Sequence, residues 1–198
     1  LSGRACPVGS MAAADVDGDG ELEMFVGVRE VPGRYPEPAT SYLLKNRGGR
    51  LGVQTAFEKI GLVNGVVFTD LAEKQRVLAT SEGFGGGHSI GACWGDFDND
   101  GLFDLFAGNF AHQDGRGDQP KSRFYRNLGA TQGFTFEDRG PCGVFYQESY
   151  ASPAAADYDN DGRDDLYITA LEGDHLFHNE GNFKFRDVTA QSGIANKG

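Results

Sequence analysis

Three short segments of the chain place carboxylates at alternate positions around a glycine, a pattern that can bind a cation. Each reads Asp-x-Asp-x-Asp-Gly-x-x-Asp/Glu, with carboxylates at positions 1, 3, 5 and 9 and the glycine at position 6. Calcium takes about six to eight oxygen ligands in a flexible shell, and alternate residues of a tight loop can converge on one ion. The carboxylates are Asp15, Asp17, Asp19 and Glu23; Asp96, Asp98, Asp100 and Asp104; and Asp157, Asp159, Asp161 and Asp165. Because glycine permits the turn, we expect three calcium ions, one per loop, each with a further backbone oxygen from position 7: Glu21, Leu102 or Arg163.

Two other interpretations of the acidic loops were weighed. An EF-hand needs a bidentate glutamate at position 12 and a helix on each side. That position holds Val26, Ala107 and Ile168, which we expect in the core of strands, so the EF-hand pattern fails in all three loops. The remaining alternative is a set of solvated acidic turns that bind no metal.

The histidines and cysteines show no catalytic arrangement, so we do not expect an enzyme. His88, His112, His175 and His178 are not grouped with a nucleophile. His175 and His178 lie three apart on a predicted strand, hence on opposite faces, which disfavours a shared metal. Three cysteines, Cys6, Cys93 and Cys142, allow at most one disulfide within the chain. The odd thiol is either buried or pairs with another chain.

The composition restricts the class of partner. The chain has 198 residues, a net charge of −11 and 39% hydrophobic residues. Surplus carboxylates repel phosphate backbones and anionic lipid, so we expect no nucleic-acid partner. No apolar run approaches the roughly 20 residues of a membrane-spanning helix, so we expect a soluble, globular protein. The chain begins at Leu1 with no signal peptide, which predicts a mature form or an excerpt.

The acidic loops belong to a longer internal repeat. Each loop is followed by a segment ending in Asn and a nearby Gly, at Asn46, Asn127 and Asn179, and then by a Phe-x-Asp. Four short strands fit each unit, and the second strands are apolar on nearly every residue, which predicts burial of both sheet faces. We therefore predict an all-β fold of three four-stranded β-propeller blades, a partial propeller or one completed by an oligomer. The single propeller segment spans 1–198, with blade units at about 10–71, 89–139 and 152–189.

Several features lie outside the repeat. Residues 47–67 are an insertion, residues 71–77 could form a helical turn, and the glycine-rich stretch 83–87 is interpreted as a flexible connection. Arg116 to Asp118 spell Arg-Gly-Asp in a polar loop. This tripeptide is either a receptor motif or, as we favour, an ordinary solvated loop. Trp94 is expected to pack between blades rather than to stack on a sugar.

Two stretches carry a family resemblance. The acidic loops followed by an apolar strand resemble the calcium loops of FG-GAP and VCBS repeats, as in integrin α-subunit propellers. Residues 95–106 (Gly-Asp-Phe-Asp-Asn-Asp-Gly-Leu-Phe-Asp-Leu-Phe) and 176–194 look especially like the cartilage acidic protein (ASPIC/UnbV) branch. The resemblance implies an extracytoplasmic, mostly seven-bladed propeller that binds partners, whereas this chain has only three blade units.

Together these observations predict a calcium-binding propeller module, secreted or otherwise extracytoplasmic, that serves protein interaction, adhesion or structural assembly. Its partner would be a protein or additional blades from the same or other chains, because three blades cannot close a ring. The alternative is a carbohydrate-binding or enzyme-associated propeller domain, with a glycan as partner.

Overall fold

The structure is a computed structural model that describes residues 8–28, 41–44, 89–109, 122–133, 136–144, 150–170 and 173–194. Several sequence predictions fall outside these ranges: Cys6, Asn46, the insertion 47–67, the Phe-x-Asp at Phe68, the segments 71–77 and 83–87, His88, His112, and Arg116 to Asp118.

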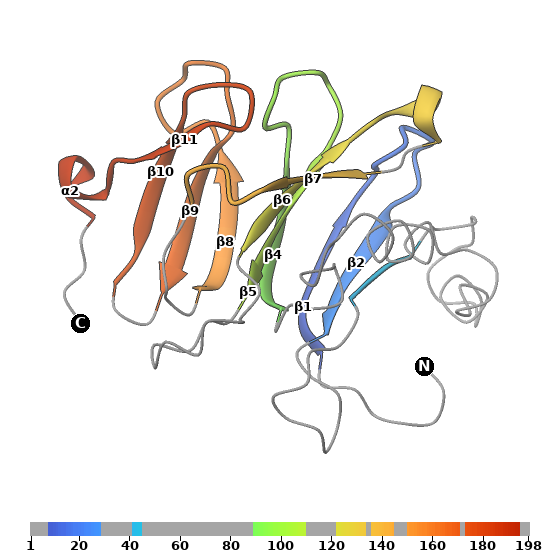
Figure 1. The fold of residues 1–198 in the computed structure, drawn as a ribbon, viewed down its shortest axis with the longest axis horizontal. Coiled ribbons are helices and arrows are strands. Elements are labelled where there is room, and N and C mark those ends of the chain that lie inside the picture. The colour runs from blue at the N-terminus through green and yellow to red at the C-terminus, as the bar shows by residue number, and fades with distance from the viewer. Residues whose placement is uncertain are drawn as a thin grey trace.

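Each repeat unit folds as an antiparallel sheet whose strands pair in chain order (Figure 1). Blade one contains β1 (Val8–Ala14), β2 (Glu23–Val28) and β3 (Tyr42–Leu44). Blade two contains β4 (Ser89–Gly95), β5 (Asp104–Asn109), β6 (Arg123–Asn127) and β7 (Phe136–Gly140). Blade three contains β8 (Tyr150–Ala156), β9 (Asp165–Ala170), β10 (His175–Asn179) and β11 (Phe185–Asp187). The all-β prediction is confirmed, and the described part of blade one shows three of its predicted four strands.

Short helical turns complete the described part of the chain. A 3-10 turn, η2 (Ala130–Gln132), precedes β7, and α2 (Thr189–Ser192) follows β11 and contacts β10. Among the described residues, no helix is long and apolar enough to cross a membrane.

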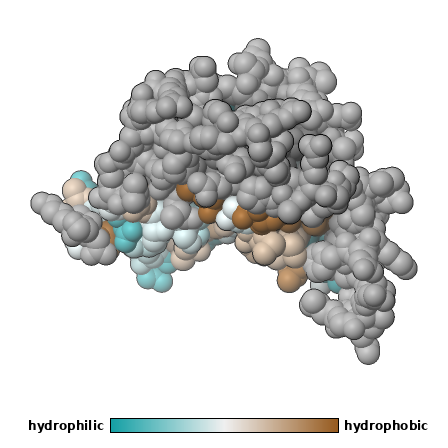
Figure 2. All heavy atoms as spheres, turned by 90° about the horizontal axis from the view of Figure 1, so that it is seen from below, coloured by the Kyte–Doolittle hydropathy of each residue, from teal (hydrophilic) through white to brown (hydrophobic). Residues whose placement is uncertain are grey.

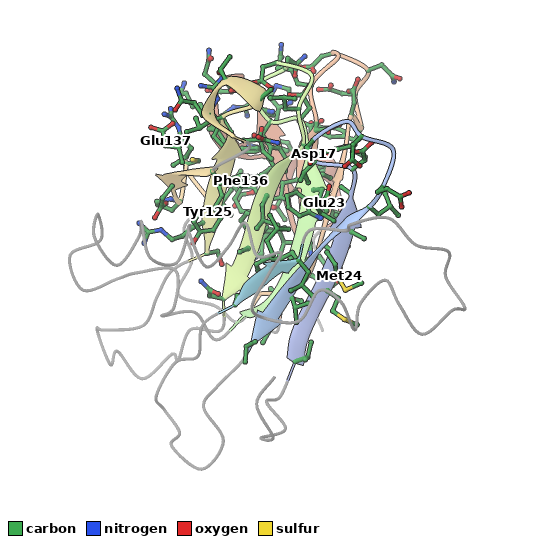
Figure 3. The ribbon with its side chains drawn as sticks, turned by 90° about the vertical axis from the view of Figure 1, so that its right-hand side faces the viewer. Asp17, Glu23, Met24, Tyr125, Phe136 and Glu137 are labelled. Atoms are coloured by element: carbon green, nitrogen blue, oxygen red, sulfur yellow. The ribbon has the colours of Figure 1, made fainter. Side chains whose placement is uncertain are left out.

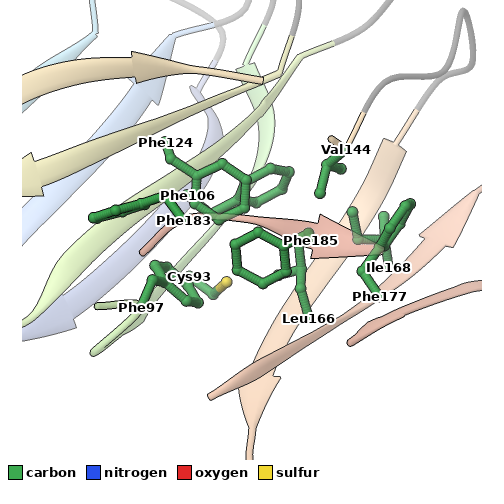
Figure 4. Close-up of a cluster of buried hydrophobic side chains, with 10 residues drawn as sticks. All are labelled: Cys93, Phe97, Phe106, Phe124, Val144, Leu166, Ile168, Phe177, Phe183 and Phe185. Atoms are coloured by element: carbon green, nitrogen blue, oxygen red, sulfur yellow. The ribbon is translucent and has the colours of Figure 1, made fainter. Parts of the chain in front are cut away.

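The hydrophobic core lies between the blades. The first strands of neighbouring blades pack together, β1 on β4 and β4 on β8. One cluster joins blades one and two: Ala14, Val16, Phe25, Leu43, Leu105, Ala107, Tyr125 and Phe136. A second joins blades two and three (Figure 4): Cys93, Phe97, Phe106, Phe124, Val144, Leu166, Ile168, Phe177, Phe183 and Phe185. The two faces of the central sheet, in blade two, therefore pack on different neighbours, as in the blades of a propeller.

Burial of the second strands depends on the place of each blade. All six residues of β5, in the central blade, are buried, as the continuous apolar run predicts. In β2 and β9, on the end blades, buried residues are mixed with half-buried ones. The prediction of two buried faces is thus met by blade two, because only that blade has described neighbours on both sides.

Side chains at the inter-blade contacts explain two details of sequence. Trp94 packs on the first cluster, with its ring centroid 6.0 Å from that of Phe136, in keeping with the expected packing role. A Cβ on Gly95 would lie 2.8 Å from the Phe97 ring and 3.0 Å from the Ala155 Cβ, so the close contact of blades two and three requires glycine here. Cys93 and Cys142 are free thiols, and burial raises the pKa of the Cys93 thiol.

Candidate metal centre

The three acidic segments form loops that join the first and second strands at the same end of the blades, the upper end in Figure 1. We name them loop one (15–23), loop two (96–104) and loop three (157–165). The glycine at position 6 has a φ of 87°, 86° and 84° in Gly20, Gly101 and Gly162. Position 4 is also left-handed, with Gly18 at 72°, Asn99 at 60° and Asn160 at 62°. Glycine and asparagine are the residues that adopt this conformation most readily, so two positions of the motif are fixed by the turn.

The carboxylate at position 1 holds the turn closed. In loop two, Asp96 accepts hydrogen bonds from the backbone N–H of Asp100 at 3.0 Å and of Gly101 at 2.9 Å. Loops one and three repeat this pair of bonds at Asp15 and Asp157. The loops therefore adopt one backbone conformation, which the shared sequence motif encodes.

The carboxylate at position 9 is buried and joins the loop to the sheet. Asp104 accepts a hydrogen bond from the Phe97 N–H at 3.0 Å and another from the Asn127 N–H of β6 at 2.8 Å. Asp165 accepts the equivalent bonds from Tyr158 and Asn179. Burial raises the pKa of Asp104 to about 8, although the two backbone hydrogen bonds favour its ionised form. A cation beside this group would stabilise the charge that burial disfavours.

The loops bring the predicted ligands together in groups of three. The donor atoms within each group lie within 4.8 Å of one another. The groups are Asp15, Asp17 and Asp19; Asp96, Asp98 and Asp104; Asp157, Asp159 and Asp161; and Asp159, Asp165 and His178. In blade one, Asp17 and Glu23 lie at the loop end of the strands (Figure 3). Each group contains two or three of the predicted carboxylates of its loop, and the full ligand sets, with the Glu21, Leu102 and Arg163 carbonyls, stay predictions.

Loop two fits a hard cation best. The Asp98 side chain is 8% exposed, and its Oδ1 atom is buried with no hydrogen-bond partner. Burial and the neighbouring Asp100 raise the pKa of Asp98, whereas Arg126 lowers it. Because a buried polar atom without a partner is costly, and because the neighbouring donors are all carboxylate oxygens, the group suits calcium.

Arg126, on β6, is a residue of this centre that the sequence analysis missed. Its Nε lies 2.5 Å from Asp98 Oδ2 and its Nη2 lies 2.9 Å from Asp100 Oδ2. The guanidinium therefore pairs with the carboxylates at positions 3 and 5, and on Asp98 it uses Oδ2 rather than Oδ1. It offsets part of the negative charge that a divalent ion would otherwise neutralise.

His178 takes the equivalent place in loop three. Its Nδ1 lies 3.2 Å from Asp165 Oδ1 and 3.3 Å from Asp159 Oδ2. His178 is not among the ligands that the sequence predicts. Although His175 and His178 do not share a site, His178 joins the carboxylates of loop three.

Arg163, whose backbone oxygen is a predicted ligand of loop three, also contributes its side chain. Its guanidinium pairs with Asp161 and donates to the Asn179 carbonyl at 2.7 Å. A repeated position in the sequence could have revealed Arg126 and His178. Each unit has a basic residue directly before the turn asparagine: Lys45, outside the described residues, Arg126 and His178.

The turn asparagines of blades two and three connect each of these blades to the loop of the blade before it. The Asn127 amide donates to the Val16 carbonyl of loop one at 2.8 Å. In the same way, Asn179 donates to the Phe97 carbonyl of loop two at 3.1 Å. Both asparagines are buried. Because Val16 and Phe97 also occupy position 2 of their loops and pack into the inter-blade clusters, loop geometry and blade packing are coupled.

Part of this repeated geometry falls within a segment that matches a known repeat family. Residues 96–168 match the FG-GAP-like repeat. The matched segment begins at position 1 of loop two and ends within β9, so it includes loops two and three and the strands between them. No curated protein matches the chain. The FG-GAP-like match supports the propeller-like arrangement of blades and a role in protein interaction.

Proposed function

We propose that the chain is a calcium-binding β-propeller module that works outside the cytoplasm and serves protein interaction. The observation that supports it most is the buried Oδ1 of Asp98, which lacks a hydrogen-bond partner within a group of carboxylate oxygens. Asp96, Asp98 and Asp104 would hold the ion in loop two. The groups of loops one and three would act in the same way.

Calcium would supply charge neutralisation and rigidity rather than catalysis. Each loop gathers four carboxylates in a small volume, and their mutual repulsion disfavours the fold when no cation is bound. Three divalent ions would change the net charge from −11 to −5, because each adds two positive charges. Since the loops are hydrogen-bonded across blades through Asn127 and Asn179, bound ions would also fix neighbouring blades relative to one another.

The acidic loops support an extracytoplasmic location. Extracellular calcium modules tolerate weak sites, with dissociation constants of roughly 10⁻⁴ to 10⁻³ M, because calcium is abundant there. Loops paired with built-in cations such as Arg126 fit that range, since the ion must compete with an existing charge partner.

Thermal unfolding with calcium and with chelator tests the proposal. At calcium concentrations about tenfold above the dissociation constant, binding to the folded state adds about 1.4 kcal/mol per site. Wild type should therefore melt several degrees higher in calcium, and magnesium should replace calcium poorly because it prefers octahedral geometry and keeps its water. Asp98→Ala should lose part of the gain in calcium and change little in chelator.

Glu137→Ala is the matched control, because Glu137 is an exposed acid on β7 outside the loops. It should keep the full response to calcium. Identical melting curves for wild type in calcium and in chelator would rule out the calcium role and leave the loops as acidic turns.

A further inference from the structure

Among the described residues, only loop three has a second group of metal-binding side chains, and this group contains an imidazole. Beside the all-carboxylate group of Asp157, Asp159 and Asp161, the loop forms a mixed group of Asp159, Asp165 and His178. In both groups the donor atoms lie within 4.8 Å of one another. In the part of the chain that the structure describes, every such group lies at the loop end of the blades, and none lies at the opposite end, which Figure 2 shows from below.

The Nδ1 atom of His178 is placed as a ligand rather than as a hydrogen-bond donor. It lies 3.2 Å from Asp165 Oδ1 and 3.3 Å from Asp159 Oδ2, yet it is buried without a hydrogen-bond partner. The lone pair of a neutral imidazole would there face two negative carboxylates, which is unfavourable unless a cation lies between them. Ligands bonded to a tetrahedral zinc ion at about 2.0–2.1 Å lie about 3.3–3.4 Å apart. The observed separations are close to these values.

Neighbouring side chains hold the imidazole in this orientation. Its other nitrogen, Nε2, lies 3.7 Å from Asp161 Oδ2, and its ring meets that of Tyr158 edge to face, with centroids 6.3 Å apart. Metal-binding histidines commonly direct their second nitrogen at a carboxylate, which fixes the tautomer and the ring. The side chain of His178 is 15% exposed and that of Asp165 is 1% exposed. The donors are therefore held in place by the fold itself.

Loop two lacks this arrangement. Its equivalent residue is Arg126, and a guanidinium has no lone pair to offer a metal. The donors of loop two, Asp96, Asp98 and Asp104, are all carboxylate oxygens. Calcium prefers such oxygens, whereas imidazole nitrogen favours zinc and similar transition metals. The two loops therefore differ in the class of cation that their donors suit.

We propose that loop three binds a divalent transition metal such as zinc through Asp159, Asp165 and His178 Nδ1, with water completing the coordination shell. Because Asp159 belongs to both groups of the loop, this metal and calcium would exclude each other there. Without a transition metal, loop three would hold calcium as the other loops do. The inference rests on the proposed role of the loops as cation sites and specifies the ion that one of them prefers.

Calorimetric titration of the 198-residue chain with zinc, in calcium-free buffer, tests the proposal. Wild type should bind one zinc ion that His178→Gln binds at least about tenfold more weakly, because even outer partners of a metal are worth about 10- to 100-fold in affinity. His175→Gln is the matched control, since His175 lies on the same strand, β10, and belongs to none of the groups. It should bind zinc as wild type does. Asp159→Asn, a second ligand variant, should also bind weakly, and circular dichroism checks that each variant is folded.

NMR of the histidine ring nitrogens identifies the ligand atom. The Nδ1 signal that is absent from His178→Gln should shift when zinc binds to wild type. Equal zinc binding by wild type and His178→Gln, or an unchanged Nδ1 signal, would overturn the proposal.

The calcium function is measured separately in His178→Gln, whose loop two is unaltered. Stabilisation of this variant by calcium, together with zinc binding that does not depend on His178, would overturn the zinc site alone. Zinc binding that depends on His178, without any stabilisation by calcium, would support the zinc site and overturn the calcium function.

Discussion

Loops two and three share one motif but differ in the cation that the neighbouring strand supplies. In both, the position-1 and position-9 carboxylates make the same backbone hydrogen bonds. In loop two the added group is Arg126, which is always charged and holds Asp98 and Asp100. In loop three it is His178, whose imidazole is charged only when protonated, beside Asp159 and Asp165. The comparison separates two functions of the carboxylates: some build the loop, and others remain available to an ion.

The largest expected loss of stability comes from replacing the carboxylate at position 9, which holds the loop on the sheet. Asp104→Ala leaves two buried backbone N–H groups, of Phe97 and Asn127, without an acceptor. Each unsatisfied group costs about 1–3 kcal/mol, so the free energy of unfolding should fall by about 3 kcal/mol or more, with or without calcium. Urea denaturation in chelator measures this, and Asp165→Ala should behave alike in loop three.

Asp98→Ala provides the contrast within loop two, because it should lower stability only when calcium is present. If Asp104→Ala and wild type unfold at the same urea concentration in chelator, the position-9 carboxylate is not a structural group. The distinction between building and binding carboxylates would then be wrong.

A smaller loss of stability is expected from replacing the turn asparagines, Asn127 and Asn179, which make equivalent hydrogen bonds in blades two and three. Asn127→Ala removes donors to the carbonyls of Val16 and Phe103 and the acceptor of the Gly129 N–H. At a net value of about 1 kcal/mol for each of these three hydrogen bonds, the free energy of unfolding should fall by at most about 3 kcal/mol. Asn179→Ala should cost a similar amount, since it makes the equivalent bonds. An exposed change such as Gln191→Ala, on α2, is the control. Equal stability of Asn127→Ala and the control would show that the cross-blade bonds contribute little.

The backbone of these loops could be predicted from sequence because the motif itself fixes it. Alternating carboxylates, the position-6 glycine and the apolar strand that follows all act within one short segment, and in each blade the loop joins the expected first and second strands. Strand β5 begins at the position-9 carboxylate itself, Asp104. The cause is local, since the Asp104 carboxylate accepts hydrogen bonds from the loop and from β6.

The electrostatics of the loops could not be predicted in the same way, because it depends on contacts between distant segments. Arg126 lies 26 residues beyond Asp100 in the chain, and only the pairing of β5 with β6 brings the two together. The same holds for Asn127, which reaches Val16 of another blade. A motif search finds ligands within a loop, whereas the counter-charge comes from the sheet.

The last prediction tests whether the positive charge of Arg126 weakens calcium binding by loop two. Arg126→Gln removes a permanent positive charge from Asp98 and Asp100, so calcium should bind loop two more tightly. The guanidinium is partly exposed, and such pairs contribute about 0.2–1 kcal/mol, which corresponds to roughly a 1.5- to 5-fold change in affinity. His178→Gln should change calcium binding by loop three less, because it removes no permanent positive charge. Calorimetric titration of each variant, with Arg139→Gln on β7 as the control, measures the difference. Arg139 pairs with Glu137 outside the loops, so its loss should leave calcium binding unchanged. Unchanged calcium affinity in Arg126→Gln would mean that the ion and the guanidinium bind different oxygens and do not compete, as the free Oδ1 of Asp98 permits. Loops two and three would then differ in composition but not in affinity for calcium.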